Sequence, residues 1–305
     1  MLSKSRQPRY RVWLLVVVLG ALAVLLIGTT MTSRAYVTKI TETTLDDFSS
    51  GEFHRTGMLD ISEEGIDSIQ LIPIGLVGTW VQDAQSLPIS LTEHSAVAAG
   101  GHVIVMGGTD ENLDSRNEVY VSRIGAGGAL EPWVEQTNAL PVALSGAAAV
   151  VSPTSDTESW IYVIGGVSGG GAALDTIYYT TFHHDTGVVD PWLTSSNPLS
   201  LPTYYLGATV HNGYIYVVGG YQEELPILGP TAEVYYAQIQ ANGDLGPWQQ
   251  GPSLPGARYN TLVVAYGAGN VNTLYVMGGR SDPVAGNNDV FFADINPTDG
   301  SLTSW

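Results

Sequence analysis

Side chains able to bind a ligand stand in the loops of this sequence, mostly after pairs of glycines. They combine carboxylates, which accept hydrogen bonds, with aromatic rings, which offer flat apolar faces, and with guanidinium groups, which donate hydrogen bonds. Aromatic rings with acids and one or two arginines suit a surface that binds a sugar or a peptide. The candidate ligand-binding residues are His94, Asp110, Asp114, Tyr205, Tyr221, Glu223, Arg258, Tyr259 and Arg280.

No set of catalytic residues emerges beside them. The chain has no cysteine, which excludes disulfides and thiolate chemistry. His183 and His184 could hold a metal ion at a turn, but neighbouring side chains on a strand point to opposite faces, and a solvated turn is the simpler interpretation. Asp110 and Asp114 lack the spacing and the bidentate glutamate of an EF-hand calcium loop. We therefore predict no catalytic residue, no metal and no cofactor.

A unit of short strands and turns occurs four times and must position these loops. In its clearest copy, Gly207–Trp248, the β-branched and aromatic residues of Tyr214–Val218 predict a strand, and Asn212-Gly213 predicts a hairpin turn. A Gly-Gly pair ends that strand in every copy, where a positive φ or a close backbone approach excludes a Cβ. The pairs are Gly107-Gly108, Gly165-Gly166, Gly219-Gly220 and Gly278-Gly279. The tryptophans of the pattern are Trp80, Trp133, Trp192, Trp248 and Trp305, at spacings of 53, 59, 56 and 57 residues.

This pattern resembles the kelch repeat, in which a strand ending in Gly-Gly is followed by a Tyr-containing strand and by a Trp that starts the fourth strand. The resemblance covers about Trp80–Trp305 and implies an all-β fold, a β-propeller of four-stranded antiparallel blades. It places the propeller at residues 66–305, with repeats at about 81–133, 134–192, 193–248 and 249–305. The repeated glycines and tryptophans are then structural. The basic residue expected before the first strand is present only as Arg258.

The connections of such a meander alternate between two faces. The loops after the Gly-Gly pairs therefore share a face with the connections that follow each tryptophan, which add Tyr204 to the candidate residues. Variable loops on a rigid scaffold are where binding usually resides.

Four units leave two ways to complete a ring. Residues Trp80–Ala84 could supply the fourth strand of the last unit, which would close a four-bladed ring. Alternatively the ring is incomplete and the chain continues past Trp305 with further blades. An open arc would leave unpaired strand edges.

The first 35 residues predict export. Residues 1–11 carry four basic residues and no acid, and 12–28 are an unbroken apolar run. We predict a transmembrane signal-anchor helix over 12–31, with the basic tail in the cytoplasm and the rest outside the cell membrane. The alternative is a signal peptide cleaved after Ala35, which would make the protein secreted. Residues 36–65 are polar and acidic, and we interpret them as a spacer.

The charge of the remaining chain restricts its partners. All 29 acids but only six of the 11 basic residues follow residue 35, which gives that part a formal charge of −23. Such a charge argues against binding to nucleic acid or docking on anionic lipid.

Three functions stay open at this point. The first is a kelch-like propeller that binds an extracellular protein or carbohydrate at the cell surface, without catalysis. The second is a glycan-active enzyme. A sialidase-like propeller would need an arginine triad, for which only Arg116, Arg258 and Arg280 are near, whereas an oxidase-like copper site needs a Tyr–Cys crosslink and is excluded. The third is a structural surface-assembly module that self-associates through an open sheet edge.

Overall fold

The computed structural model describes residues 15–19, 22–26, 57–59, 71–73, 80–224, 227–268 and 271–305. Within these residues the regular secondary structure consists of strands, with no helix. The strands form antiparallel sheets, so the predicted all-β class is confirmed. The chain divides into two compact units, residues 1–81 and 82–305, and each is described by itself.

The smaller unit contains two short hairpins. Strand β1 (Leu15–Leu19) pairs with β2 (Leu22–Leu26), and β3 (Gly57–Leu59) pairs with β4 (Leu71–Pro73). Both β1 and β2 lie where the sequence predicts a helix over 12–31, and the β-branched run Val16–Val18 favours an extended backbone. The rest of that segment and most of the predicted spacer lie outside the described residues. No helix in the described part of the chain is long and apolar enough to cross a bilayer.

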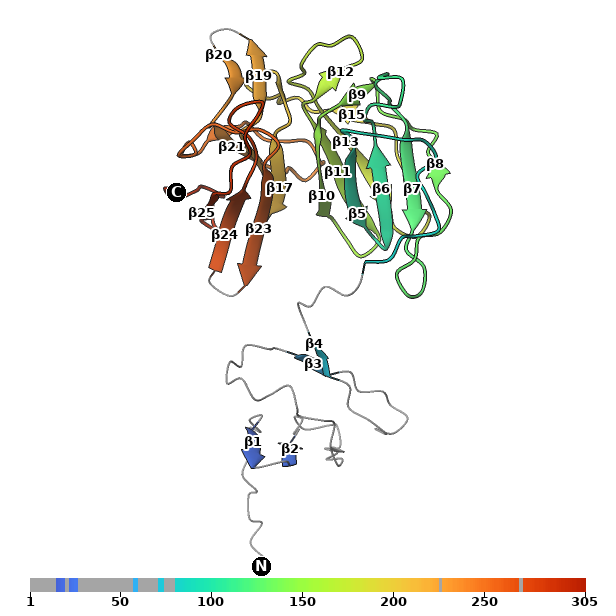
Figure 1. The fold of residues 1–305 in the computed structure, drawn as a ribbon, viewed down its shortest axis with the longest axis vertical. Helices are drawn as coiled ribbons and strands as arrows, with labels where there is room; N and C mark the ends of the chain where they lie inside the picture. Colours follow the sequence, from blue (N-terminus) through green and yellow to red (C-terminus); the bar gives the residue numbers. More distant parts are fainter. Residues whose placement is uncertain are drawn as a thin grey trace, which may run out of the picture. The chain divides into compact units, whose positions relative to one another are not determined.

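The larger unit contains four successive antiparallel sheets, each built from consecutive segments of the chain (Figure 1). The first sheet contains β5 (Ser95–Ala99), β6 (His102–Met106), β7 (Val119–Arg123) and β8 (Val134–Glu135). The second contains β10 (Ala148–Pro153), β11 (Glu158–Ile164), β13 (Ile177–His183), β14 (Val188–Val189) and β15 (Leu193–Thr194). The third contains β17 (Gly207–His211), β18 (Tyr214–Val218), β21 (Val234–Gln238) and β22 (Gln249–Gln250). The fourth contains β23 (Leu262–Ala268), β24 (Val271–Met277) and β25 (Val290–Asp294).

Two smaller sheets complete this unit. One contains β9 (Leu144–Ser145) and β12 (Val167–Ser168). The other contains β16 (Thr203–Tyr204), β19 (Tyr221–Glu224) and β20 (Ile227–Pro230). Figure 1 shows β9, β12, β19 and β20 at the same end of the larger unit, which is the end where the strands before the Gly-Gly pairs finish.

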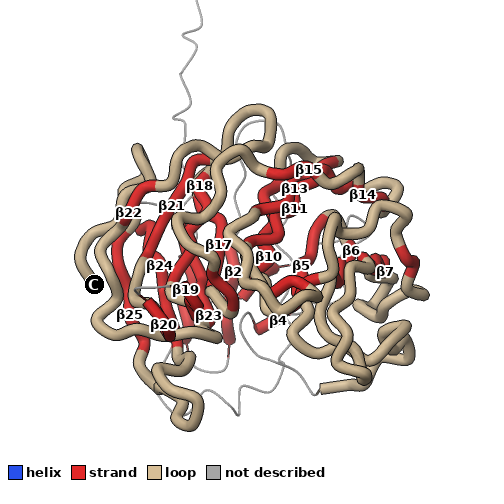
Figure 2. The backbone as a smooth tube through the Cα atoms, turned by 90° about the horizontal axis from the view of Figure 1, so that it is seen from above, coloured by secondary structure: helices blue, strands red, loops and turns tan. Residues whose placement is uncertain are grey.

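The four sheets stack in chain order. The first strand of each sheet packs against the first strand of the next, β5 on β10, β10 on β17 and β17 on β23. Figure 2 shows these first strands toward the middle of the unit and the last strands toward its outside. Three buried apolar clusters lie between consecutive sheets, and each takes residues from both of its neighbours. The core is therefore a series of sheet-to-sheet interfaces.

Three of the tryptophans that end the units join their sheet to the preceding connection, whereas the buried indole nitrogen of Trp133 has no partner among the described residues. The indole nitrogen of Trp192 donates to the carbonyl of Asn138 at 3.1 Å, and that of Trp248 donates to Asn197 at 3.1 Å. Trp305 donates to Pro252 at 2.7 Å in the same way. These three contacts support the structural interpretation of the spacing, whereas Trp80 is exposed.

Closure of the ring by Trp80–Ala84, one of the two alternatives, is not found in the described residues. The fourth sheet has three strands, and β25 has no fourth strand beside it there. Asp83 instead accepts a hydrogen bond from the backbone nitrogen of Leu130 at 2.9 Å, in the turn between β7 and β8. A local contact with the first sheet thus replaces the long-range pairing.

One turn carboxylate ties the third sheet to the second. The Asp244 carboxylate accepts hydrogen bonds from the hydroxyls of Ser195 and Ser196, both at 2.6 Å, and from the nitrogen of Leu245 at 2.7 Å. Burial alone raises the pKa of this carboxyl, but the hydrogen bonds outweigh burial and hold the pKa below its ordinary value. The charged form therefore stabilises the fold above the unfolded-state pKa, and this contribution is lost as the pH falls through the folded-state pKa.

We expect Asp244→Asn to lower the free energy of unfolding by about 1–2 kcal/mol at pH 7, because charge-assisted hydrogen bonds become neutral ones. The difference from the unsubstituted chain should shrink as the pH falls below the ordinary carboxyl pKa. Urea unfolding at pH 7 and near pH 3 measures both values. Asp185→Asn, at an exposed turn residue, is the control and should change little at either pH. A difference for Asp244→Asn that is independent of pH would contradict the assignment.

Candidate ligand-binding site

An inner rim of four residues lies two positions before the first strand of each sheet. Its members are Glu93, Gly146, Tyr205 and Asn260, and all four have a positive φ, between 50° and 62°. Their backbones are joined from sheet to sheet. Asn260 N donates to Tyr205 O at 2.8 Å, Tyr205 N donates to Gly146 O at 2.7 Å, and Gly146 N donates to Glu93 O at 3.0 Å. The chain of hydrogen bonds fixes these four residues relative to one another.

Four tyrosines gather at this rim. Tyr204 and Tyr205 have ring centroids 4.9 Å apart, and Tyr204 lies 5.4 Å from Tyr221, its partner across β16 and β19. Tyr259 closes the group, with centroids 6.2 Å from Tyr205 and 5.5 Å from Tyr221. The cluster joins the connection before the third sheet, the loop after its Gly-Gly pair and the connection before the fourth sheet. We call these four residues the tyrosine cluster.

Two carboxylates accept hydrogen bonds from two of the four hydroxyls of the cluster. The Tyr204 hydroxyl donates to Glu223 Oε1 at 2.6 Å, and the Tyr205 hydroxyl donates to Glu93. Burial and these carboxylates together raise the pKa of both tyrosines above the ordinary value. Both hydroxyls therefore stay protonated at neutral pH and act as hydrogen-bond donors. The Tyr205 ring also lies against Gly146, where an added Cβ would stand 2.8 Å from it.

The sequence analysis named all four tyrosines of this cluster, and Glu223, as candidate residues. The structure brings them together. Arg280 is joined to Tyr259 by a pair of backbone hydrogen bonds of 2.8 and 2.9 Å, while its guanidinium donates to the carbonyl of Pro283. Arg280 therefore lies beside the cluster.

Three other candidates belong to the first sheet. Asp110 Oδ1 accepts hydrogen bonds from the backbone nitrogens of Asn112 and Asp114, so its carboxylate orders its own loop. Asp114 is exposed in the same loop. His94 is half-buried next to Glu93, and its Nδ1 has no hydrogen-bond partner among the described residues. None of the three contributes to the tyrosine cluster.

Arg258 is not a surface residue, which corrects its place among the candidates. It is 2% exposed, and its guanidinium donates to the carbonyl of Gly278 at 3.0 Å. The guanidinium carbon lies 4.4 Å from the centre of the Phe291 ring, and Nη2 lies 3.5 Å from Asp289. A buried cation needs such partners, and here they hold the fourth sheet together. Its exposure is too low for ligand contact.

Glu93 is a candidate site residue that the sequence prediction missed. It precedes β5 by two residues, as Tyr205 precedes β17. Alignment of the four units on their first strands is the signal that would have placed Glu93 on the same rim as Tyr205.

The paired histidines take part in sheet contacts. The two ring nitrogens of His183 face Glu158 at 3.3 Å and Asp190 at 3.2 Å. The ring of His184 contacts the Ser159 hydroxyl at 2.8 Å and the Asp156 carbonyl at 3.0 Å. In the described ranges, no group of three or more histidines and acids is arranged to hold a metal ion.

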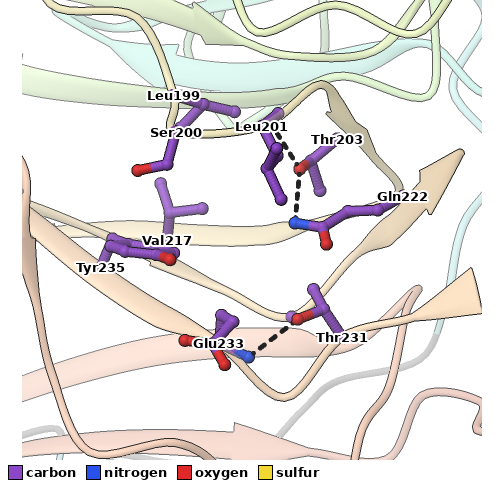
Figure 3. Close-up of a pocket in the computed structure, with 10 residues that line it drawn as sticks. Leu199, Ser200, Leu201, Thr203, Val217, Gln222, Thr231, Glu233 and Tyr235 are labelled. Carbon is purple, nitrogen blue, oxygen red and sulfur yellow. Dashed lines mark hydrogen bonds between the residues drawn. The ribbon is translucent and has the colours of Figure 1, made fainter. Parts of the chain in front are cut away.

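A cavity beside β19 is too small for a sugar. It has a volume of about 20 Å³ and lies between the Leu199–Thr203 segment and the strands of the third sheet (Figure 3). Figure 3 shows Gln222 pointing toward Thr203, and its Nε2 donates to the Thr203 hydroxyl at 3.3 Å. The buried Gln222 Oε1 has no protein partner within the described part of the chain. The space suits one water molecule, which such an oxygen would bind.

The architecture is thus an all-β unit of repeated antiparallel sheets with a tyrosine cluster on its loop end. No family model and no curated protein sequence matches the chain. Among solved structures, the chain is similar to the one titled "Structure of YjhT", with a TM-score of 0.54 and 14% sequence identity. The match covers 74% of this chain and 72% of that one. At this identity the likeness concerns the fold alone.

Proposed function

We propose that residues 66–305 form a kelch-like β-propeller or part of one. The support is the stacking of four antiparallel meanders in chain order, with the first strands innermost and each Gly-Gly pair at the end of a second strand. Each sheet then corresponds to one blade.

We infer that this propeller is a carbohydrate-binding module. The observation that carries the inference is the tyrosine cluster, four rings in mutual contact at the rim of the loop end. Tyrosine combines a flat apolar face with a polar edge, which suits the alternating C–H and hydroxyl surface of a sugar. The carboxylates of Glu93 and Glu223 already accept hydrogen bonds from the cluster, and their remaining lone pairs can accept more from sugar hydroxyls.

The proposed place of action is outside the cell membrane. The basic tail at residues 1–11 and the apolar run that follows it support export, as anchor or as signal peptide. The formal charge of −23 after residue 35 agrees with a solvated surface that does not bind nucleic acid.

A glycan-active enzyme has less support. The three arginines near the loops each have a partner of their own: Arg116 pairs with Glu118 and Asp110, Arg258 is buried, and Arg280 donates to Pro283. A sialidase-like triad needs three guanidinium groups available to one ligand, and buried Arg258 does not offer one.

The test is a glycan array followed by titration calorimetry with the oligosaccharide that binds best to the full chain. Tyr221→Ala should weaken binding by about thirtyfold, because central aromatic residues dominate such interfaces. Tyr266→Ala, which removes an exposed ring from β23, should leave the affinity unchanged. Equal affinities of the unsubstituted chain, Tyr221→Ala and Tyr266→Ala would overturn the proposal. So would an array on which no glycan binds, if a peptide library yields a ligand.

A further inference from the structure

Two carboxylates beside the tyrosine cluster have no cation as a partner. Glu93 and Glu223 are both exposed, and neither takes part in an ion pair within the described part of the chain. Each side chain is nevertheless held in place, because one of its oxygens accepts a hydrogen bond from a tyrosine hydroxyl of the cluster. The second oxygen, Oε2, accepts none from the described residues. Two fixed negative charges therefore border the aromatic surface.

The backbone of the rim brings Glu93 to the cluster from the first unit. Glu93 and Tyr205 have φ values of +54° and +53°, a left-handed conformation that residues with a Cβ rarely adopt. The Tyr205 ring lies against Gly146 of the second unit, which has no Cβ to block it, and its hydroxyl reaches Glu93. Backbone strain of this kind persists only where the surrounding contacts enforce it, and it clusters at ligand sites. The first unit thus contributes a carboxylate to rings of the third and fourth.

The guanidinium beside the cluster is already matched by a carboxylate. Arg280 donates to the carbonyl of Pro283 at 3.2 Å. Hydrogen bonds from two backbone nitrogens hold the pKa of Asp282 below its ordinary value, and the charge of Arg280 contributes to the same shift. Asp282 itself borders the cluster, because its carbonyl accepts a hydrogen bond from the Tyr259 hydroxyl at 3.3 Å. The two glutamates therefore leave the rim with a net negative charge.

This charge distribution discriminates among sugars. A uronic or sialic acid would place its carboxylate beside two like charges, and juxtaposed like charges oppose binding. A neutral sugar would gain only the stacking on the rings and the hydrogen bonds of its hydroxyls. An amino sugar adds an ammonium group, which donates charge-assisted hydrogen bonds to carboxylate oxygens and is attracted to the face of an aromatic ring. Both attractions are available at this cluster, since the two carboxylates are bonded directly to its tyrosines.

We propose that the tyrosine cluster binds polysaccharides that contain protonated amino-sugar units, and that Glu93 and Glu223 determine this specificity. The ammonium group of one unit donates to Oε2 of either glutamate, while the C–H face of the sugar ring packs on a tyrosine. The proposal rests on the carbohydrate-binding function proposed above and adds the charge of the ligand.

Titration calorimetry with the full chain in a mild detergent compares three probes of equal length. They are the trimers of glucosamine, N-acetylglucosamine and galacturonic acid, which are cationic, neutral and anionic in a slightly acidic buffer. The glucosamine trimer should bind about tenfold more tightly than the acetylated trimer, because two exposed ion pairs contribute roughly a factor of two to five each. The galacturonic acid trimer should bind most weakly. Added salt should remove most of the difference between the trimers.

The double variant Glu93→Gln with Glu223→Gln tests the two carboxylates. Its amide oxygens still accept hydrogen bonds from the tyrosine hydroxyls, but both negative charges are lost. The preference for the glucosamine trimer over the acetylated trimer should therefore disappear. Glu131→Gln with Glu135→Gln is the control, because it removes the same formal charge from two exposed residues at the last strand of the first sheet. It should keep the preference, and an equal loss in both double variants would overturn the role of Glu93 and Glu223.

The probes separate failure of this specificity from failure of the proposed function. If Tyr221→Ala weakens binding of the acetylated trimer but the glucosamine trimer is not preferred, the charge specificity is wrong and the sugar site stands. Tighter binding of the galacturonic acid trimer, or no binding of the glucosamine trimer, would also overturn the specificity. Tighter binding of trilysine than of the glucosamine trimer would make the ligand a basic peptide and overturn both proposals. The salt titration uses the unsubstituted chain, so it tests the charges even if the double variant does not fold.

Discussion

Replacing Gly219 with alanine should lower the free energy of unfolding of the chain by roughly 3–5 kcal/mol, among the largest effects expected for a single methyl group. Gly219 has a φ of +59°, where a Cβ costs about 1–2 kcal/mol by itself. An added Cβ would also stand 2.3 Å from the carbonyl oxygen of Arg258. That oxygen accepts the hydrogen bond from Gly220 N at 2.9 Å, so it cannot move away without breaking a bond between the third sheet and the connection to the fourth.

Gly213→Ala separates the cost of the positive φ from the cost of the close backbone contact. Gly213 also has a positive φ, +77°, but a Cβ there would meet no atom within 4 Å. We expect it to cost only about 1–2 kcal/mol, the penalty for the backbone conformation. Urea unfolding followed by tryptophan fluorescence measures both variants under the same conditions. Equal losses for the two would show that the close approach at the Gly-Gly pair has no energetic role.

The Gly-Gly pairs were predictable because the backbone conformation that requires glycine depends only on the residues at the end of one strand. All eight glycines have a positive φ, between 59° and 108°, and a strand that ends in such a pair is visible in the sequence of each unit. The register of the hairpins followed in the same way from alternation and turn residues, as in the pairing of β17 with β18 around Asn212-Gly213. Antiparallel pairing between neighbours in the chain needs no knowledge of distant residues.

The tyrosine cluster and the burial of Arg258 depend on how consecutive sheets meet. Tyr221 and Tyr259 come from different units, and only the stacking of the third sheet on the fourth brings their rings within 5.5 Å. Arg258 and Tyr259 are neighbours in one connection and both are buried, Arg258 beside Phe291 and Tyr259 within the cluster. Residue type and spacing do not determine what each of two buried neighbours packs against.

Tyr216→Ala should cost about 3–5 kcal/mol of unfolding free energy, the usual range for removing a large buried aromatic side chain. Tyr216 is 0% exposed, and its ring is stacked on Tyr236 with centroids 6.0 Å apart. Tyr216→Phe keeps the ring and removes only the hydrogen bond to Gly300. It should cost about 1–2 kcal/mol, because the buried carbonyl of Gly300 loses its donor. Urea unfolding of both variants separates the packing of the ring from the hydrogen bond.

Tyr275→Phe is the matched control, because Tyr275 has the same position in the fourth sheet as Tyr216 has in the third. The hydroxyl of Tyr275 has no acceptor to lose among the described residues, so the substitution should change the free energy of unfolding by less than about 0.5 kcal/mol. A cost as large as that of Tyr216→Phe would contradict the assignment, because it would mean that the Tyr275 hydroxyl also donates a buried hydrogen bond.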